Sequence, residues 1–443
     1  MRLASTPPLP RNIDKNMIRV LFVHNNFPAQ YVHIARALGE QPGVELAAIG
    51  SRTARRLPNV KLLRYALANS DVSTTHPFAR RFDLECRRAE EVLYAAATLS
   101  SSGFIPDLVL AHSGWGESLP LKSVFPNATH VPYCEWFYRV DGGDVNFDPE
   151  FPQNGIDGDI NLRLKNASTL LSLVECNQAI SPTQWQRSTF PKEFQSKIEV
   201  IHEGVDVTKA RPSRNAEFRL RSGRVLTKSD EVVTFIARSF EPVRGFHIFM
   251  RALPRILAAR PKAQILLLGG DGVPYGALPP AGKTWKSYFL NELDKRLDLK
   301  RLHFTGNTSH DDLIRALQIS SAHVYLTYPF VLSWSLLEAM SIGCLVIASA
   351  TAPVKEVVNS ENGILVPFFD FNQLADRVIE ALAHPRRFTA LRTRARSTVV
   401  ENFDMHNVCL PKMLKFLGLD STRKLSKVTE ELEQICDQTE AGA

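Results

Sequence analysis

The chain has 443 residues, of which 44% are hydrophobic and 22% are charged, and its formal net charge is +7. This length exceeds what one ordinary hydrophobic core supports, so we expect two domains of roughly 200 residues each. No apolar run reaches the ~18 residues of a membrane span, and no motif for nucleic-acid binding is present. The modest positive charge suits anionic ligands or an acidic membrane surface.

The first 16 residues are rich in proline and polar side chains and contain no apolar signal core, so we expect 1–16 to be a flexible extension. The six cysteines are widely scattered and form no CxxC pair. This pattern favours free thiols in a reducing compartment. We therefore expect a cytoplasmic protein.

In the first half, short runs rich in Val, Ile and Leu alternate with longer amphipathic stretches. The runs predict buried parallel strands at residues 19–24, 44–49, 61–65, 107–111, 130–136, 178–181 and 198–201. The stretches predict helices around 29–39, 76–100, 160–175 and 183–189. This alternation predicts a Rossmann-like domain over 17–207, with ligands at the carboxyl ends of the strands.

The second half repeats the plan and predicts a second Rossmann-like domain over 208–402, so the fold class is α/β. Strands are predicted at 232–237, 264–268, 302–305, 323–326, 345–348 and 364–366, and helices at 245–259, 283–297, 309–318, 335–341 and 371–400. We expect a C-terminal helix over residues 403–420, which could pack back on the N-terminal domain. A polar tail, 421–443, follows.

Two arginines lie where the first strand of the second domain ends and its first helix begins. Arg238 and Arg244 are six residues apart, and two guanidinium groups at such a loop can converge on a diphosphate. Solvated surface arginines are the alternative. Gly269-Gly270 ends the next strand, where bare backbone can approach a ligand. Phe304 lies near the end of the strand after that, where backbone groups could frame a nucleotide base.

The segment 328–340 predicts a turn that leads into a helix. Ser335 and Glu338 have the spacing of a capping box, with Leu336, Leu337 and Met340 as an apolar face behind them. A helix start can also hold phosphate, and a carboxylate can accept hydrogen bonds from the two hydroxyls of a ribose. Both interpretations stay open at this point.

Taken together, these residues resemble the family-4-type retaining glycosyltransferases, also called glycosyl transferases group 1. In the second half the resemblance rests on Arg238, Glu241-Pro242, Arg244-Gly245, Gly269-Gly270, Gly306, the 329–340 segment, Glu356 and Asn362-Gly363. In the first half it is looser and rests on 24–31, 112–115, 181–183 and 202–206.

The resemblance implies the GT-B architecture, in which two Rossmann-like domains face each other across a cleft. It implies that a sugar moves from a nucleoside diphosphate to an acceptor hydroxyl with retention at the anomeric carbon, without a metal or other cofactor. Arg238 and Arg244 would stabilise the leaving diphosphate, and Glu338 would bind ribose. The remaining donor-binding residues would be Glu241, Gly269, Gly270, Phe304, Phe330, Ser333, Trp334 and Ser335.

Three departures from the family pattern are visible. The pattern has two glutamates eight positions apart, but Phe330 stands eight positions before Glu338 and cannot accept a hydrogen bond. Three explanations stay open. Another polar group, such as Ser333 or Glu241, contacts the donor sugar; the donor has an apolar group or nothing in place of that hydroxyl; or the protein transfers no sugar. Arg244 replaces the usual lysine. The first strand is followed by a segment without paired glycines, so the Asn25 or Gln30 side chains would substitute.

On the acceptor side, we expect His24, Asn25, Gln30, Glu135, Trp136 and Tyr138 to line the opening. His112 follows a buried strand and is a catalytic candidate that could reach the donor sugar; a core histidine is the alternative. Asp157-Gly158-Asp159 imitates the DxD motif of metal-dependent glycosyltransferases, and we regard it as accidental. No metal site is predicted.

The sequence therefore predicts a metal-independent retaining glycosyltransferase, by family analogy in surface glycan or glycoconjugate assembly. The alternatives are a nucleotide-sugar-binding scaffold without catalysis and a sugar phosphorylase or synthase on the same fold. The acceptor would be a glycan, a lipid-linked molecule or a small molecule. Basic residues at 52–64 and 80–88 either form a solvated face or dock on anionic lipid at the inner face of the membrane.

Overall fold

The computed structural model describes residues 17–152 and 154–420, so the predicted extension 1–16 and tail 421–443 lie outside the described residues. The chain divides into two compact units. Unit 1 comprises Met1–Cys134 and Ala167–Ile180, and unit 2 comprises Glu135–Asn166 and Ser181–Ala443. The chain therefore leaves unit 1, contributes one segment to unit 2 and returns. The domain boundary expected after residue 207 lies inside unit 2.

Unit 1 is built on a parallel sheet with the strand order β3-β2-β1-β4-β5-β6. Its strands are β1 (Ile18–Val23), β2 (Val44–Gly50), β3 (Val60–Arg64), β4 (Leu108–His112), β5 (Thr129–Tyr133) and β6 (Ala179–Ser181). The expected strand 130–136 ends early, at Tyr133, because the chain then passes into unit 2. The central position of β1 explains why Val20 to Val23 are wholly buried.

Helices cover this sheet: α1 (Val32–Gly39), α2 (Arg80–Ser101), α3 (Leu121–Val124) and α5 (Ala167–Glu175), with a 3₁₀ turn η1 (Ala29–Tyr31) before α1. Successive side chains of a strand point to opposite faces, so alternate residues share a core. Leu21 and Val23 pack in one cluster with Val92, Ala96 and Leu99 of α2. The alternation of side chains along β1 and the apolar face of α2 thus explain this hydrophobic core.

Unit 2 contains a six-stranded parallel sheet with the order β12-β11-β10-β13-β14-β15. Its strands are β10 (Val232–Ser239), β11 (Gln264–Gly270), β12 (Leu302–Gly306), β13 (Ala322–Tyr325), β14 (Val346–Ser349) and β15 (Ile364–Val366). Both sheets have the strand–helix alternation of Rossmann-like domains, which confirms the predicted α/β class.

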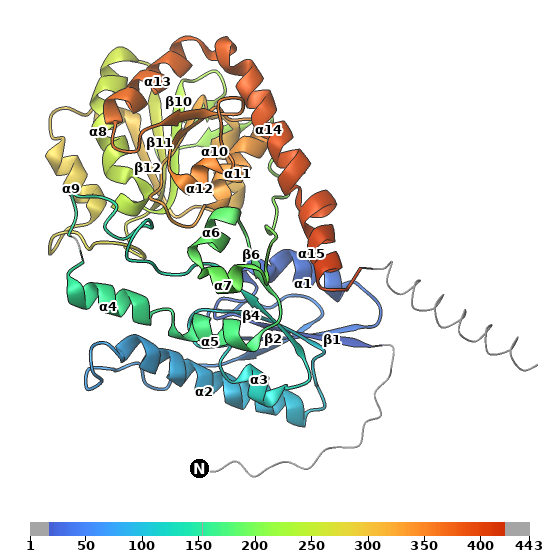
Figure 1. Ribbon diagram of the computed structural model, residues 1–443. Coiled ribbons are helices and arrows are strands. Elements are labelled where there is room, and N and C mark those ends of the chain that lie inside the picture. Colours follow the sequence, from blue (N-terminus) through green and yellow to red (C-terminus); the bar gives the residue numbers. More distant parts are fainter. Residues whose placement is uncertain (1–16, 153, 421–443) are drawn as a thin grey trace, which may run out of the picture. The chain divides into compact units, whose positions relative to one another are not determined.

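Helices lie on both faces of the unit 2 sheet (Figure 1). One face carries α8 (Phe246–Ala259), α9 (Trp285–Glu292) and α13 (Phe371–Ala383), and the other carries α10 (His310–Gln318), α11 (Trp334–Ile342), α12 (Ala352–Lys355) and α14 (Thr389–Phe403). Val233 and Phe235 of β10 belong to the first core, whereas Val232 and Ile236 belong to the second. Because helices bury both faces of this sheet, its strands are apolar at nearly every position.

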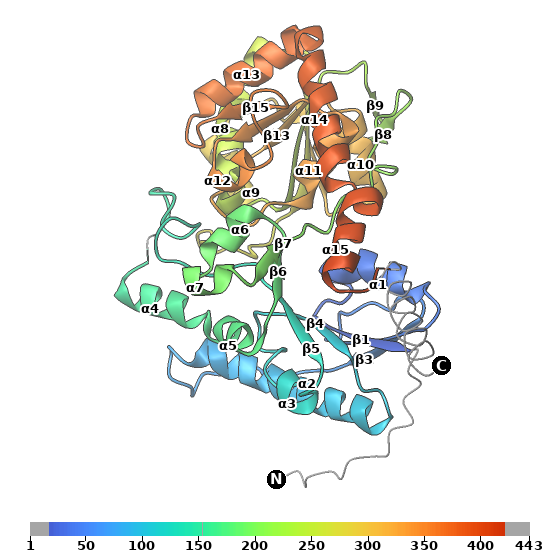
Figure 2. The ribbon, with the colours of Figure 1, turned by 45° about the vertical axis from the view of Figure 1, so that its right-hand side comes forward.

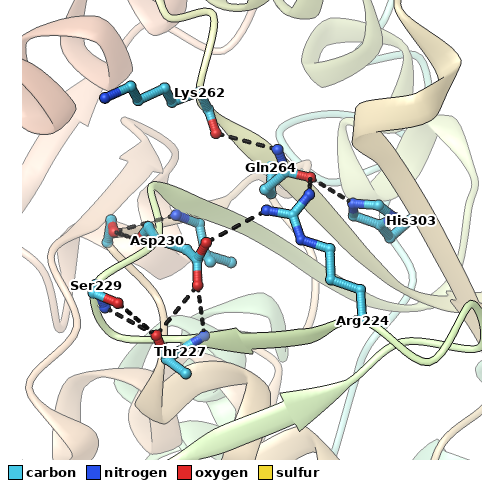
Figure 3. Close-up of polar contacts among 9 residues, drawn as sticks. Arg224, Thr227, Ser229, Asp230, Lys262, Gln264 and His303 are labelled. Atoms are coloured by element: carbon cyan, nitrogen blue, oxygen red, sulfur yellow. Dashed lines mark hydrogen bonds and ion pairs between the residues drawn. The ribbon is translucent and has the colours of Figure 1, made fainter.

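A short antiparallel hairpin of β8 (Glu217–Arg219) and β9 (Val225–Thr227) lies beside α10 (Figure 2). Its connection to β10 is fixed by Asp230, whose Oδ2 accepts a 2.9 Å hydrogen bond from the Thr227 N–H. Arg224 bridges Asp230 to Gln264, and the Gln264 side chain also contacts the His303 ring (Figure 3). This network ties the hairpin to β11 and β12.

Short elements complete unit 2: α4 (Ile156–Leu164), α6 (Gln184–Thr189), α7 (Lys192–Gln195), β7 (Ile198–Val200), η2 (Pro242–Arg244), η3 (Leu299–Arg301), η4 (Pro385–Phe388), the π-helical turn η5 (Met405–Cys409) and α15 (Leu410–Phe416). The C-terminal helix expected over 403–420 is thus two shorter elements. Within unit 2, Nζ of Lys412 in α15 donates to the Val200 carbonyl at 2.7 Å.

Two predicted helices are interrupted. The helix expected over 371–400 stops at Ala383, because Pro385 lacks the N–H that a continuing helix requires. The helix expected over 160–175 divides into α4 and α5 around Asn166. The Asn166 side chain instead bonds both backbone groups of Tyr138, at 2.8 and 2.9 Å. Among the described residues, no helix is long and apolar enough to cross a membrane.

Candidate functional site

Arg238 and Arg244 lie where β10 passes into α8, as predicted. Arg238 is an exposed residue near the end of β10, and Arg244 ends the 3₁₀ turn η2. Gly245 follows with φ +65°, and a Cβ there would approach the Leu326 Cβ to 2.3 Å. Only glycine therefore allows this turn to lie so close to β13.

The Arg244 side chain is held in place by the segment before α11. Its Nη1 donates to Thr327 Oγ1 and to the Val331 carbonyl, both at 3.0 Å. The guanidinium carbon lies 5.6 Å from the centre of the Phe330 ring and 5.9 Å from that of Tyr275. Such cation–π contacts fix the direction of the group while other N–H donors remain for a ligand.

Glu241 is a buried carboxyl beside this turn. Its Oε2 accepts a 3.0 Å hydrogen bond from the Tyr275 N–H, while Oε1 is buried and has no hydrogen-bond partner within the described ranges. Burial raises the pKa of Glu241 to about 7, against the opposing effects of the Tyr275 N–H and of the Arg244 and Arg238 charges. A carboxyl in this state can take up or release a proton near neutral pH.

Gly269 and Gly270 end β11, next to β10, with Gly270 paired with Ser239. A Cβ on Gly269 would lie 2.5 Å from the Ala237 carbonyl oxygen, and one on Gly270 would lie 3.0 Å from Asn307 Oδ1. Glycine at these two positions therefore allows close packing of β11 against β10 and Asn307. Phe304, in β12, is half-buried and meets Phe240 edge-on at 5.6 Å.

The helix α11 begins at Trp334, and its N-cap is Ser333, whose Oγ accepts from the Ser335 N–H. The predicted capping box on Ser335 and Glu338 is therefore wrong, because the helix starts two residues earlier. Glu338 instead pairs with His310, whose Nε2 lies 2.5 Å from Glu338 Oε1. This hydrogen bond raises the pKa of His310.

Trp334 is exposed, and its Nε1 donates to Glu203 Oε2 at 3.2 Å. Phe330, by contrast, is 5% exposed and packs edge-on against Trp136 at 5.0 Å and against Tyr275 at 5.1 Å. The position at which the family pattern has a glutamate is therefore filled by an aromatic ring that contacts the Arg244 guanidinium.

Unit 1 brings four of the expected residues together. The rings of His24 and His112 meet edge-on at 5.4 Å, and His112 stacks on Trp115 at 4.4 Å. Burial and, to a smaller extent, the neighbouring His112 charge lower the pKa of His24 to about 3, against a hydrogen bond with Gln30 that raises it. The Asn25 N–H donates to Glu117 Oε2 at 3.1 Å.

Sequence reasoning missed Glu117, which lies directly beyond the His112-to-Trp115 stretch. Its carboxyl is fully buried and accepts a hydrogen bond from the Tyr65 hydroxyl. Burial raises the pKa of Glu117 to about 6. The available signal was its position after β4, together with Gly116, whose φ of +88° and close approach to the Glu85 backbone require glycine.

The expected acceptor-side residues fall into both units. His24, Asn25 and Gln30 lie in unit 1, whereas Glu135, Trp136 and Tyr138 belong to the segment of unit 2. The Glu135 carbonyl accepts from Gln186 Nε2 at 2.7 Å, and the Tyr138 ring lies 5.1 Å below Lys165 Nζ. Trp136, expected on the acceptor side, instead contacts Phe330, which is one of the donor-binding candidates.

Among the described residues, one group has carboxylate and imidazole atoms close enough to hold a metal: Asp148, Glu150 and His247. Asp148 Oδ2 already accepts from the Tyr328 hydroxyl at 2.7 Å and lies 3.0 Å from His247 Nε2. Both oxygens of Glu150 bind Arg251 at 2.6 Å. Because these ligand atoms are engaged by protein groups, we assign no metal there. Asp157 and Asp159 lie in the first turn of α4.

Comparison with known families identifies the class of the protein. The model described as Glycosyl transferase family 4 group matches residues 42–210, and the model described as Glycosyl transferases group 1 matches residues 219–398. The two matches together span most of the chain: the first begins just before β2, and the second contains all six strands of the unit 2 sheet. The chain therefore belongs to the family-4-type glycosyltransferases, which have the GT-B fold.

Two curated relatives illustrate the sequence similarity. D-inositol 3-phosphate glycosyltransferase of Rhodococcus jostii is 27% identical over 204 residues, which are 45% of this chain and 43% of the relative. GDP-mannose-dependent monoacylated alpha-(1-6)-phosphatidylinositol monomannoside mannosyltransferase of Corynebacterium glutamicum is 26% identical over 231 residues, which are 49% of this chain and 56% of the relative. The chain thus matches about half the length of these relatives.

Solved structures share the fold at low identity. Sucrose-phosphate synthase from Thermosynechococcus elongatus has a TM-score of 0.69 and 17% identity, covering 91% of this chain and 99% of that one. HepE from Anabaena, solved with UDP and glucose, has a TM-score of 0.61 and 16% identity, covering 90% of this chain and 99% of that one.

Proposed function

We propose that the protein is a retaining glycosyltransferase that moves a sugar from a nucleoside diphosphate to an acceptor hydroxyl without a metal ion. The observation that carries the proposal lies within unit 2. Arg238 near the carboxyl end of β10 is followed by Arg244 in the turn η2, Gly269 and Gly270 end the neighbouring strand β11, and the Arg244 side chain is bonded to the segment before α11. Ligands bind at this edge in doubly wound sheets.

In the proposed reaction the bond between the anomeric carbon and the diphosphate oxygen breaks, and negative charge develops on that oxygen. Fixed cations aimed at the charge lower the barrier. Arg244 is suited to this because two oxygen acceptors and two rings already hold its guanidinium in one orientation. The acceptor oxygen then bonds to the anomeric carbon, and its proton passes to the departing phosphate. No protein base is required for that transfer.

Nucleotide recognition follows from the same elements. Glu338 would accept hydrogen bonds from the ribose hydroxyls in competition with His310, and the backbone around Phe304 would frame the base. The relatives' names mention GDP-mannose, inositol phosphate and a phosphatidylinositol glycolipid, and the HepE structures hold UDP or UDP-glucose. These chemistries suggest UDP-glucose and GDP-mannose as donors to test, with a glycan, a lipid-linked molecule or a small molecule as acceptor.

Membrane docking through the basic residues of unit 1 remains a proposal. Several of these side chains are engaged within the unit, since Arg81 pairs with Glu85, Arg87 pairs with Asp83 and Arg64 donates to the Ala54 carbonyl. This reduces the charge available to anionic lipid. Sedimentation with anionic vesicles at low and high salt tests the contact, and no binding at low salt would rule it out.

A panel of nucleotide sugars tests the proposed activity, with release of the nucleoside diphosphate as the readout. We expect turnover with at least one donor, unchanged by EDTA, and a product whose anomeric configuration matches that of the donor by NMR. Arg238→Ala should reduce turnover at least a hundredfold. Arg394→Ala, on the exposed part of α14, is the matched control and should leave turnover unchanged.

Binding without turnover for every donor would instead support the scaffold alternative. The observation that favours this alternative is Phe330, because its ring takes the place of a carboxylate that could hold a sugar hydroxyl.

A further inference from the structure

Side chains at 147–150 fix the segment Glu135–Asn166 to the rest of unit 2. Phe147 contacts the rings of Tyr328, Phe368 and Phe369 at 5.0 to 5.3 Å. Asp148 accepts from the Tyr328 hydroxyl, and Glu150 forms two hydrogen bonds with Arg251. Residues 147–150 therefore have a defined position against the rest of unit 2.

Trp136, near the start of the segment, is 8% exposed and lies edge-on to Phe330 at 5.0 Å. Its Nε1 is buried, and no hydrogen-bond acceptor for it exists among the residues that the structure describes. A buried N–H without an acceptor is rare in folded proteins, and in a binding site a ligand can supply the acceptor. This indole is therefore available to a molecule bound beside Phe330.

Asp144 lies on the same part of the segment. The preceding Gly143 is buried, and a Cβ on it would lie 3.7 Å from Cζ2 of Trp136, so this turn lies next to the indole. The Asp144 carboxyl lies within electrostatic reach of Arg244 and Lys165. Burial raises the pKa of Asp144 to about 6 against these charges, so the group is largely ionised at neutral pH.

A second polar atom, Oε1 of Glu241, is also buried without a partner in the described chain, close to Arg244 and Tyr275. The surroundings of Arg244 thus combine the packed rings of Trp136, Phe330 and Tyr275 with two unsatisfied polar atoms, Nε1 of Trp136 and Oε1 of Glu241. Aromatic faces with a few polar anchors are the usual lining of a pocket for a sugar-sized ligand.

We propose that Trp136 and Asp144 bind the transferred sugar of the donor, the indole N–H donating to a sugar oxygen and the Asp144 carboxylate accepting from a sugar hydroxyl. They would supply, from the segment 135–166, the polar contact that Phe330 cannot make. The inference rests on the proposed function, because it names residues that recognise the donor of that reaction.

The test compares binding of each nucleotide sugar with binding of the nucleotide that lacks the sugar. The probes are UDP with UDP-glucose and GDP with GDP-mannose, measured by calorimetry on the full-length protein. The variants are Trp136→Phe, which keeps an aromatic ring and removes the N–H, and Asp144→Asn, which keeps the shape and removes the charge. Asp141→Asn, exposed on the same loop, is the matched control.

We expect each variant to weaken nucleotide-sugar binding about tenfold and to leave nucleotide binding unchanged. Equal weakening of both ligands, or no change in either, would overturn the inference while leaving the proposed function intact. If the unaltered protein binds none of the four ligands, the proposed function and this inference both fail. Thermal melting shows whether each variant is folded, and Asp144→Asn alone decides the result if Trp136→Phe does not fold.

Discussion

Nε2 of His310 lies 2.5 Å from Oε1 of Glu338, so the residue proposed to bind ribose is already engaged by a titratable side chain. The hydrogen bond to Glu338 raises the pKa of His310 above its ordinary value. Below that raised pKa the histidine is charged and competes with the ribose hydroxyls. Above it the ring is neutral and competes less strongly.

We therefore expect nucleotide affinity to increase as pH rises through the raised pKa of His310. The measurement is the Kd of UDP or GDP between about pH 6 and about pH 9. In His310→Ala, Glu338 is free at every pH, so binding should be tighter at the acid end and this pH dependence should disappear. An identical pH profile in the variant would show that His310 does not compete for Glu338.

Glu241 should make the stability of the protein depend on pH. A carboxyl whose pKa is raised from 4.5 to about 7 in the folded state stabilises the fold fully below the unfolded value, and that contribution is lost as pH rises through about 7. Relative to Glu241→Gln, the unaltered protein should lose on the order of 3 kcal/mol of unfolding free energy across this window. Urea denaturation at several pH values measures the difference.

The comparison with Glu241→Gln removes the contributions of other groups, including Glu117, which titrates in the same range. The glutamine carbonyl can still accept from the Tyr275 N–H, so the local hydrogen bond is retained. Parallel stability curves for the two proteins would contradict this assignment.

Gly245 and Gly223 allow a matched test of steric crowding at the turn that carries Arg244. Both have positive φ, +65° and +88°, so alanine strains the backbone at either position. A Cβ on Gly245 would also lie 2.3 Å from the Leu326 Cβ, whereas nothing lies within 4 Å of a Cβ on Gly223. We expect Gly223→Ala to cost about 1 kcal/mol and Gly245→Ala to cost at least about 2 kcal/mol more.

Thermal or urea denaturation of the two glycine variants gives the comparison. Gly245→Ala should also reduce turnover, because the η2 turn that positions Arg244 must shift. Equal stability losses in the two variants would mean that β13 yields to the added methyl group.

Replacing Phe330 with alanine removes a ring that packs on Trp136, Tyr275 and the Arg244 guanidinium. The expected loss of unfolding free energy is about 3 to 5 kcal/mol, and Phe330→Leu should lose less because it retains most of the apolar volume. Both variants remove the cation–π contact with Arg244, so both should lower turnover. Turnover unchanged in Phe330→Leu would show that the ring does not orient Arg244.

The two sheets could be predicted because buried parallel strands leave a local signal, and the candidate residues at the ends of β10 and β11 and after β13 were chosen from the same signal. The start of α11 was misplaced because Ser333 and Ser335 both suit an N-cap, and only the observed backbone distinguishes them. The break at Asn166 was missed because its cause is a contact with Tyr138, 28 positions earlier in the sequence. Likewise, Trp136 and Phe330 are far apart in the sequence, so the pattern of neighbouring residues could not predict that their rings are in contact.

The position of 135–166 in the sequence also affects how the chain is made. Residues Met1–Cys134 and Ala167–Ile180 can complete the sheet of unit 1 early in synthesis, but the ring partners of Phe147 are Tyr328, Phe368 and Phe369. At the usual rate of translation these partners emerge on the order of 10 s or more after Phe147. During that time Phe147 lacks the three rings that it contacts in the folded protein, so its position depends on the last part of the chain to be made.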